Sequence, residues 1–104
     1  MEGNTPLTEA IYYILLAVRN PNYGYGIIQD ISEMTNDRVL LGPGTLYGAI
    51  STMLSKHWIS LYSEEKNSRK KKEYLITEEG RKVFAEEVVR LNELLKNAHI
   101  MERE

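Results

Sequence analysis

Breaks in the first half of the chain, at residues 20–26 and 42–44, limit the fold more than any other feature of the sequence. The first break contains Asn-Pro-Asn and Tyr-Gly-Tyr-Gly, and the second is Gly-Pro-Gly. Glycine and proline interrupt regular backbone, so each segment between the breaks has room for one short helix. Apolar residues recur at helical spacing in all three segments. The second helix is expected to turn four apolar residues inward, Ile27, Ile28, Ile31 and Met34. We therefore predict three helices in the first 57 residues.

The first predicted helix is apolar on nearly all sides. Thr5 and Pro6 are expected to be its N-cap and its first helical residue. Besides the stripe that faces the core, it carries a second stripe of Tyr12, Tyr13 and Leu16. Such a helix must be covered on both sides. A chain of 104 residues has little material for that cover, so we expect a second subunit to supply it.

The third predicted helix has two unlike faces. Leu46, Ile50 and Met53 lie on its apolar side, and His57 falls on the same side, where we interpret it as a core histidine. The opposite face is small and polar and has no acidic residue; it consists of Gly44, Thr45, Gly48, Ser51, Thr52 and Ser55. An ordinary surface helix carries Glu and Lys on its outer side. A small, uncharged face is therefore typical of close approach to another surface.

Two short segments with alternating polarity, Ile59–Ser63 and Lys72–Ile76, follow the third helix and predict a β-hairpin. The stretch 66–72 has five bases and no acid; they are Lys66, Arg69, Lys70, Lys71 and Lys72. A short charge run is often only a solvated loop. It would also suit phosphates, because charge acts locally, over a Debye length of about 10 Å, whatever the net charge of −2. Three helices followed by a hairpin is the order of a winged helix-turn-helix.

A last helix is predicted from Thr77-Glu78-Glu79-Gly80 onward, where two acids in the first turn suit the helix dipole. The apolar residues that follow are spaced by four and three in alternation, which is a heptad seam; they are Phe84, Val88, Leu91, Leu95 and Ala98. The segment 77–104 would be about 40 Å long as one helix. Since this is too long to pack wholly on a small core, the seam indicates dimerisation, with packing inside one chain as the alternative.

The composition argues against other classes of function. Absence of cysteine excludes disulfides and thiolate metal sites. His57 and His99 lie far apart and make a poor metal site, so we expect no metal and no cofactor. No arrangement of serine, histidine and acid suggests catalysis, and we expect no enzyme. The sequence has no apolar run of about 18 residues and no signal peptide, so we expect a cytoplasmic protein without membrane contact.

Three stretches resemble the signature segments of PadR-family regulators, in order and register over about residues 7–85. They are Tyr-Gly-Tyr-Gly-Ile-Ile at 23–28, Gly-Pro-Gly-Thr-Leu-Tyr-Gly-Ala-Ile at 42–50, and Arg-Lys-Lys-Lys-Glu-Tyr-Leu-Ile-Thr-Glu-Glu-Gly at 69–80. The Pro-Gly-Thr-Leu-Tyr segment is the most specific. The chain departs from the family at Asn67-Ser68, where a glycine often precedes Arg69. It also departs at Glu73, where a second aromatic residue often precedes Tyr74.

This resemblance implies a winged-helix head, residues 1–76, and a C-terminal dimerisation helix, residues 77–104. It further implies a repressor that binds inverted-repeat operators and releases them in response to small molecules. Some multidrug-binding members carry a ligand-stacking tryptophan on the last helix. The one tryptophan of this chain is Trp58, before the hairpin, so the planar-drug pocket is not implied.

We therefore expect a sequence-specific DNA-binding regulator. Its helix would enter the major groove, and its basic hairpin would contact phosphates or the minor groove. The candidate contacts to DNA are Gly44, Thr45, Tyr47, Gly48, Ser51, Thr52, Lys66, Arg69, Lys70 and Lys71. A winged helix that serves as a protein-interaction module, with its basic hairpin facing an acidic partner, is the alternative.

We expect the regulator to act as a homodimer. In this interpretation the last helix packs on the first helix of the partner. The candidate interface consists of Tyr12, Tyr13, Leu16, Phe84, Val88, Leu91, Leu95 and Ala98. A small-molecule effector is expected in the central space near Tyr12, Tyr13, Leu91 and Leu95.

Overall fold

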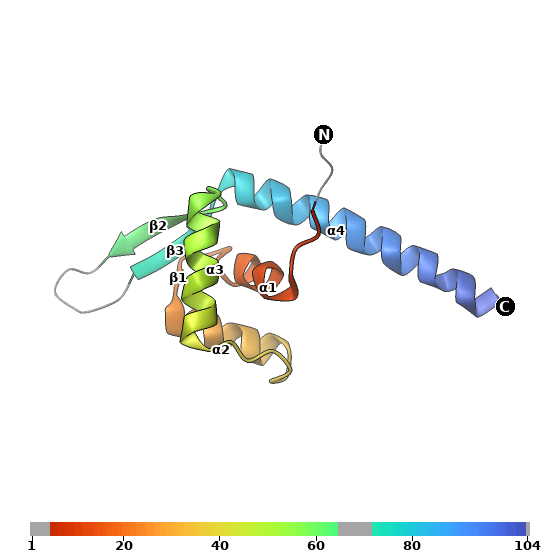
Figure 1. The fold of residues 1–104 in the computed structure, drawn as a ribbon, viewed down its shortest axis with the longest axis horizontal. Helices are drawn as coiled ribbons and strands as arrows, with labels where there is room; N and C mark the ends of the chain where they lie inside the picture. Colours follow the sequence, from red (N-terminus) through yellow and green to blue (C-terminus); the bar gives the residue numbers. More distant parts are fainter. Residues whose placement is uncertain (1–4, 65–71, 104) are drawn as a thin grey trace.

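Three helices and a small antiparallel sheet form a head, and one long helix projects from it (Figure 1). The computed structural model describes residues 5–64 and 72–103. In chain order the elements are α1 (Glu9–Ala17), β1 (Asn22–Tyr23), α2 (Gly24–Met34), α3 (Pro43–Ser55), β2 (Ile59–Glu64), β3 (Lys72–Ile76), α4 (Glu78–Ala98) and the 3₁₀ helix η1 (His99–Arg103). The predicted winged helix-turn-helix, mainly helical with one hairpin and a long last helix, is confirmed.

The first helix begins one turn later than the sequence predicted. Thr8, not Thr5, is the N-cap of α1, and its hydroxyl accepts a hydrogen bond from the amide of Ile11 at 3.1 Å. Pro6 lies outside the helix. Both threonines are good capping residues and they stand three positions apart, so residue type alone does not separate them.

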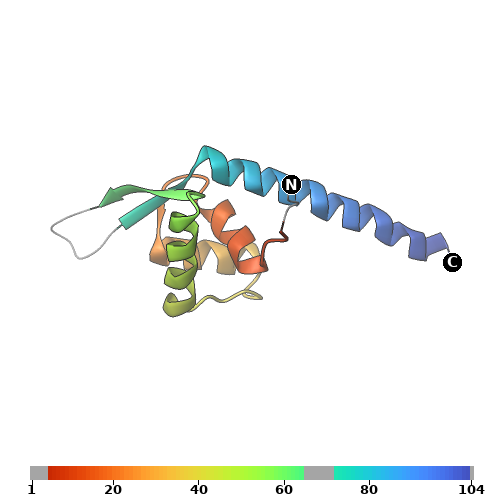
Figure 2. The ribbon, with the colours of Figure 1, turned by 45° about the horizontal axis from the view of Figure 1, so that its top comes forward.

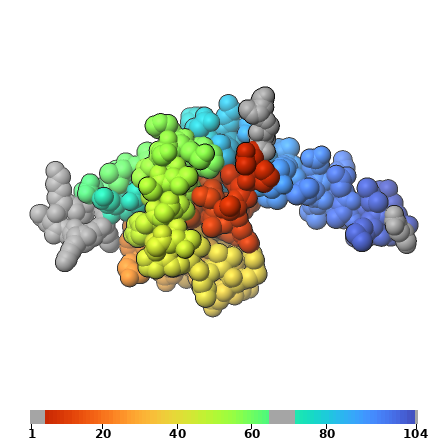
Figure 3. Space-filling model, in the orientation of Figure 1, coloured from red at the N-terminus to blue at the C-terminus, as the bar shows by residue number. Residues whose placement is uncertain are grey.

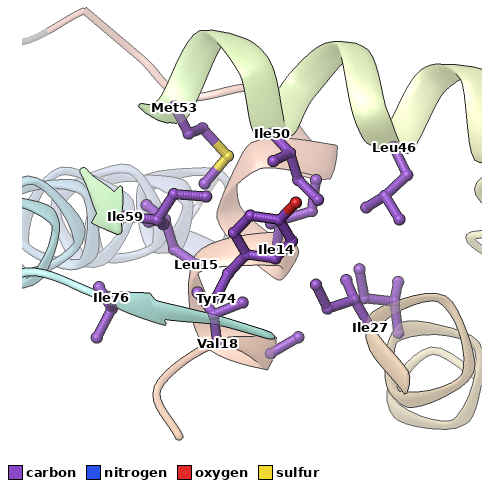
Figure 4. Close-up of a cluster of buried hydrophobic side chains, with 12 residues drawn as sticks. Ile14, Leu15, Val18, Ile27, Leu46, Ile50, Met53, Ile59, Tyr74 and Ile76 are labelled. Carbon is purple, nitrogen blue, oxygen red and sulfur yellow. The ribbon is translucent and has the colours of Figure 1, made fainter. Parts of the chain in front are cut away.

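The core lies between α1, α2, α3 and the sheet (Figure 4). Its buried residues are Ile14, Leu15, Ala17, Val18, Ile27, Ile31, Leu46, Ile50, Met53, Ile59, Tyr74 and Ile76. Two residues predicted for this core lie elsewhere. Met34, the last residue of α2, is 42% exposed. His57 is exposed because α3 ends at Ser55 and the backbone of His57 is left-handed, with φ of 63°, so it no longer follows the helical face.

The sheet has three strands, in the order β1-β3-β2, and both pairs are antiparallel. β2 pairs with β3 from Ile59 opposite Ile76 to Glu64 opposite Lys72, with a bulge between Leu61 and Ser63. Only the first residue of β2 is buried, so the outer part of the hairpin extends beyond the head (Figure 2). The two-residue strand β1 was not predicted, because a strand this short leaves no periodicity in the sequence.

The start of α4 is packed against the turn that follows α3. The amide of Thr77 donates to the carbonyl of Trp58 at 3.0 Å, and its hydroxyl donates to the carbonyl of His57 at 2.7 Å. The same hydroxyl accepts from the amide of Gly80 at 2.9 Å. A Cβ on Gly80 would lie 2.1 Å from the carbonyl oxygen of Trp58, so only glycine permits this approach. Beyond this contact, all described residues from Leu91 onward are exposed.

Candidate nucleic-acid interface

The outer face of α3 is an open surface of small and polar side chains. Proline at the first helical position starts α3, and three apolar side chains, Leu46, Ile50 and Met53, fix its inner side in the core. The six predicted contacts on this helix are all exposed: Gly44, Thr45, Tyr47, Gly48, Ser51 and Thr52. In Figure 3, α3 lies across the front of the head with no other element over it. The sequence of α3 contains no charged residue, so nothing on this face repels a polyanion.

Gly44 and Gly48 have no role in packing within the chain. A Cβ on either residue would meet no described atom within 4 Å. By contrast, a Cβ on Gly24 or Gly80 would collide with a neighbour at 2.1 Å. Glycine inside a helix costs about 1 kcal/mol relative to alanine. Gly48, in the interior of α3, therefore weakens the helix without any contact in the head that requires it, which fits a surface that another molecule approaches closely.

Tyr47, in the stretch 42–50, packs against Gly24, in the stretch 23–28. Its hydroxyl oxygen lies where a side chain of Gly24 would begin, 2.1 Å from the position of a Cβ. The ring thus covers the start of α2, while half of the side chain remains exposed. A residue larger than glycine at position 24 would push the Tyr47 side chain away from the start of α2. The stretches 23–28 and 42–50 are therefore parts of one contact between α2 and α3.

The predicted basic contacts of the hairpin, Lys66, Arg69, Lys70 and Lys71, lie outside the described residues. The strands that lead to them are described, and Glu64 and Lys72 form the last pair of the ladder. Ser63 donates a hydrogen bond to Glu73 at 2.9 Å beside this pair. In the sequence, residues 65–71 connect β2 to β3.

The predicted dimer residues fall into two groups. In the first, Tyr12 of α1 stacks on Phe84 of α4 in the same chain, with ring centroids 4.7 Å apart, and meets Tyr13 edge to face at 5.5 Å. Leu16 and Val88 are half-buried, as these rings are. In the second group, Leu91, Leu95 and Ala98 are exposed on the part of α4 that projects from the head. The predicted effector residues are divided in the same way, with Tyr12 and Tyr13 on the head and Leu91 and Leu95 on the projecting helix.

A groove between the segment before α1, the end of α3 and the start of α4 was not predicted. It has a volume of about 520 Å³ and is lined by Thr5, Pro6, Leu7, Thr8, Ile11, Thr52, Lys56, Trp58, Val83, Glu86 and Glu87. These three segments meet on the side of the molecule seen in Figure 3. The ammonium group of Lys56 lies 5.3 Å from the ring centroid of Trp58, a cation–π distance. Thr52 belongs both to this groove and to the outer face of α3.

Glu87 is a buried carboxylate that sequence reasoning also missed. It is 3% exposed and forms two hydrogen bonds with Arg90, from Nε at 2.9 Å and from Nη2 at 2.6 Å. It also accepts a hydrogen bond from the amide of Leu7 at 3.3 Å. The hydrogen bonds from Arg90 lower the pKa of the Glu87 carboxyl, outweighing burial, which acts to raise it. The spacing of Glu87 and Arg90 suggests a surface ion pair in the sequence, but nothing there signals burial.

The described residues contain no group of three or more His, Asp or Glu that could hold a metal ion. Within 5–64 and 72–103, no helix is long and apolar enough to cross a membrane.

Comparisons with known proteins agree with this architecture. The sequence matches the "Transcriptional regulator PadR-like family" over residues 13–86. The comparison with curated proteins gave no match. Among solved structures, a transcriptional regulator from Clostridium thermocellum has 23% identity and a TM-score of 0.68, with 91% of this chain and 90% of that chain covered.

Two further structures carry the family name. A PadR-like transcription factor from Bacteroides fragilis has 24% identity and a TM-score of 0.73, covering 88% of this chain and 87% of that one. A PadR family transcriptional regulator from Eggerthella lenta has 21% identity and a TM-score of 0.76, covering 88% and 79%. At these identities the structures establish the fold, whereas the family match spans most of the sequence. This chain belongs to the PadR-like family of transcriptional regulators.

Proposed function

We propose that this protein is a homodimeric repressor that binds an inverted-repeat DNA operator and releases it when a small molecule binds. The observation that carries the DNA-binding part is the outer face of α3. That face is exposed, contains no charged residue, and includes two glycines that no contact within the head requires. The major groove of B-DNA is wide enough to accept one helix, and a helix approaches base edges most closely where its side chains are small.

The composition of α3 indicates how specificity is divided. The exposed side of the helix offers hydroxyl groups on Thr45, Ser51 and Thr52 but no Arg, Asn or Gln for bidentate contacts to bases. Direct base contacts are therefore sparse, and water and DNA shape supply part of the specificity. Tyr47 donates its hydroxyl to a phosphate. Phosphate contacts that do not depend on DNA sequence come from four bases that lie between the two hairpin strands in the sequence, Lys66, Arg69, Lys70 and Lys71.

The projecting part of α4 supports the dimer. Leu91, Leu95 and Ala98 continue the heptad seam beyond the last buried residue of α4, Glu87, and they are exposed in the single chain. Exposed apolar stripes of this kind commonly mark an interface. We place the partner on this stripe and on the half-buried side of α1. Two heads held in this way present two α3 helices to half-sites about one DNA turn, 34–36 Å, apart.

The effector is placed between the head and the distal α4, near Tyr12, Tyr13, Leu91 and Leu95. A ligand that prefers a head spacing unlike that of the operator complex by about 1–3 kcal/mol weakens operator binding about 5- to 150-fold. This makes the protein a repressor that a ligand releases.

A fluorescence-anisotropy titration of labelled duplex over a range of salt concentrations tests the proposal. We expect binding to random duplex at low salt, with a steep fall as salt rises. Lys70→Ala combined with Lys71→Ala removes four charges from a dimer and should lower the salt slope by up to about 3.6, at about 0.9 per phosphate. The matched control is Lys82→Ala with Lys96→Ala on α4, which should leave the slope unchanged. Absence of binding to any duplex at low salt contradicts the proposal.

Selection of bound DNA from a random pool tests the dimer and the operator together. Recovery of an inverted repeat with half-sites about one turn apart is the expected result. A single, unrepeated site would contradict the homodimer on DNA.

A further inference from the structure

Glu87 is the last buried residue of the long helix α4. Gly80 and Phe84 are in contact with the head before it. After it, all described residues from Leu91 onward are exposed. The amide of Leu7 that binds Glu87 lies directly before Thr8, the N-cap of α1. Glu87 therefore connects α4 with the beginning of the head's first helix.

The chemistry at this point constrains orientation. A carboxylate that is 3% exposed must be paired, because burial of an unpaired charge is costly. Arg90 approaches it with two nitrogens, so the carboxylate group is held in one plane. The Leu7 amide then reaches the carboxylate from a different element. The two hydrogen bonds from Arg90 lie within α4 and orient the carboxylate, and the bond from the Leu7 amide joins that oriented carboxylate to the head. A buried apolar residue at position 87 would fill the same space but would make no such directional contact.

We propose that Glu87 is a positioning residue that sets the angle of α4 relative to the DNA-binding head, and through it the distance between the two heads of the dimer. The angle of α4 is a property of one chain and does not depend on the proposed function. Only the claim about the distance between the two heads rests on the proposed function. Helix α4 continues for 11 residues beyond Glu87, which is about 16 Å at 1.5 Å per residue. A rotation of 10° at Glu87 therefore moves the end of α4 by about 3 Å, close to the rise of one base pair along DNA, about 3.4 Å.

Two spin labels in one chain measure the angle directly. The protein has no cysteine, so Glu33→Cys on α2 and Lys96→Cys on α4 provide two unique sites, both on exposed residues. Labelled chains are diluted with unlabelled protein so that distances within one chain dominate. For wild-type position 87 we expect one narrow distance distribution. For Glu87→Gln we expect the distribution to at least double in width or to shift by 2 Å or more.

The matched control is Glu9→Gln. Glu9 also pairs with an arginine, Arg38, but the pair is exposed and joins α1 to the loop before α3. This substitution should leave the distribution between the labels unchanged. If Glu87→Gln fails to fold, Arg90→Lys provides the second test, since it keeps the charge but loses the two-pronged contact, and it should broaden the distribution to a smaller degree.

Operator binding provides a second measurement, the preference for one half-site spacing. A substitution that only lowered the stability of the head would not change this preference. Duplexes with one half-site should bind wild type and Glu87→Gln equally. Moving the half-sites of a full operator by one base pair should lower its affinity for the wild-type protein at least fivefold. The same change should lower its affinity for Glu87→Gln less than twofold. A distribution and a spacing preference that both match wild type would overturn the inference. If the wild type itself binds no duplex, the proposed function fails, and the label distances still decide whether Glu87 positions α4.

Discussion

Replacement of Gly48 by alanine should stabilise the free protein and weaken its binding to DNA. Gly48 lies in the middle of α3 with ordinary helical backbone, and an added Cβ would meet no described atom within 4 Å. Alanine is preferred over glycine inside a helix by about 0.5–1 kcal/mol. For a domain of this size, 1 kcal/mol corresponds to about 4–8 °C in the unfolding midpoint, so we expect a rise of about 2–8 °C.

The same methyl group faces DNA in the proposed complex. Forcing one extra carbon into a close-packed contact costs about 1–3 kcal/mol, which is about a 5- to 150-fold loss of operator affinity. A substitution that raises the stability of the free protein and lowers its affinity for DNA indicates that the small side chains of this surface serve binding.

Thermal unfolding followed by circular dichroism, at one fixed protein concentration, measures the first effect, and anisotropy with the selected operator measures the second. Asn97→Ala on the exposed part of α4 is the matched control, because it also improves helix propensity but lies away from α3. It should raise the midpoint and leave DNA affinity unchanged. If Gly48→Ala bound the operator as tightly as wild type, α3 would not approach DNA with this face. A lowered midpoint would refute the assignment of Gly48 to open space.

Three further predictions concern residues of α4. Gly80→Ala should lower the free energy of unfolding by about 1–3 kcal/mol in urea titrations, because its Cβ would collide with the carbonyl of Trp58 and overpacking costs this much; an unchanged midpoint would contradict the close contact. Glu87 has a lowered pKa in the folded protein, so its contribution to stability is present above its unfolded pKa of about 4.3 and is lost as pH falls through the folded value. Glu87→Gln should therefore show a flatter fall in urea midpoint below pH 5 than wild type, and equal slopes would argue against an ionised Glu87. Leu91→Asp with Leu95→Asp should yield monomers in sedimentation velocity, and a dimer that persists would remove the seam from the interface.

Regular periodicity made most of the elements predictable. The apolar spacing of α1, α2 and α3 and the alternation of the two hairpin strands each extend over enough residues to identify the element. The two faces of α3 were predicted in the same way. The helical repeat is enough to assign Leu46 to the buried face and Gly48 to the exposed face. Where the periodic signal is weak, prediction failed: β1 has two residues, and the choice between Thr5 and Thr8 as N-cap depends on backbone conformation.

Other errors arose where a single backbone angle or a distant contact decides the outcome. His57 was assigned to the core by continuing the helical repeat, but α3 has already ended and the residue adopts a left-handed conformation. Glu87 was not singled out from the sequence. Its burial depends on Leu7, which lies 80 positions earlier in the chain and leaves no local pattern. Sequence reasoning therefore located the surfaces that face outward better than the contacts that orient them.

The attachment of α4 determines how a signal can reach DNA. The turn at residues 57–58 follows α3, precedes β2, and receives the hydrogen bonds of Thr77 at the start of α4. Helix α3, the hairpin and the long helix are therefore joined at one place, and Glu87 adds a second fixed point further along α4. Two fixed points on one rigid helix leave little freedom for α4 to move against its own head. A ligand that shifts the dimer seam must then move each head as a whole, so it should change the preferred half-site spacing while leaving the affinity of one head for one half-site unaltered.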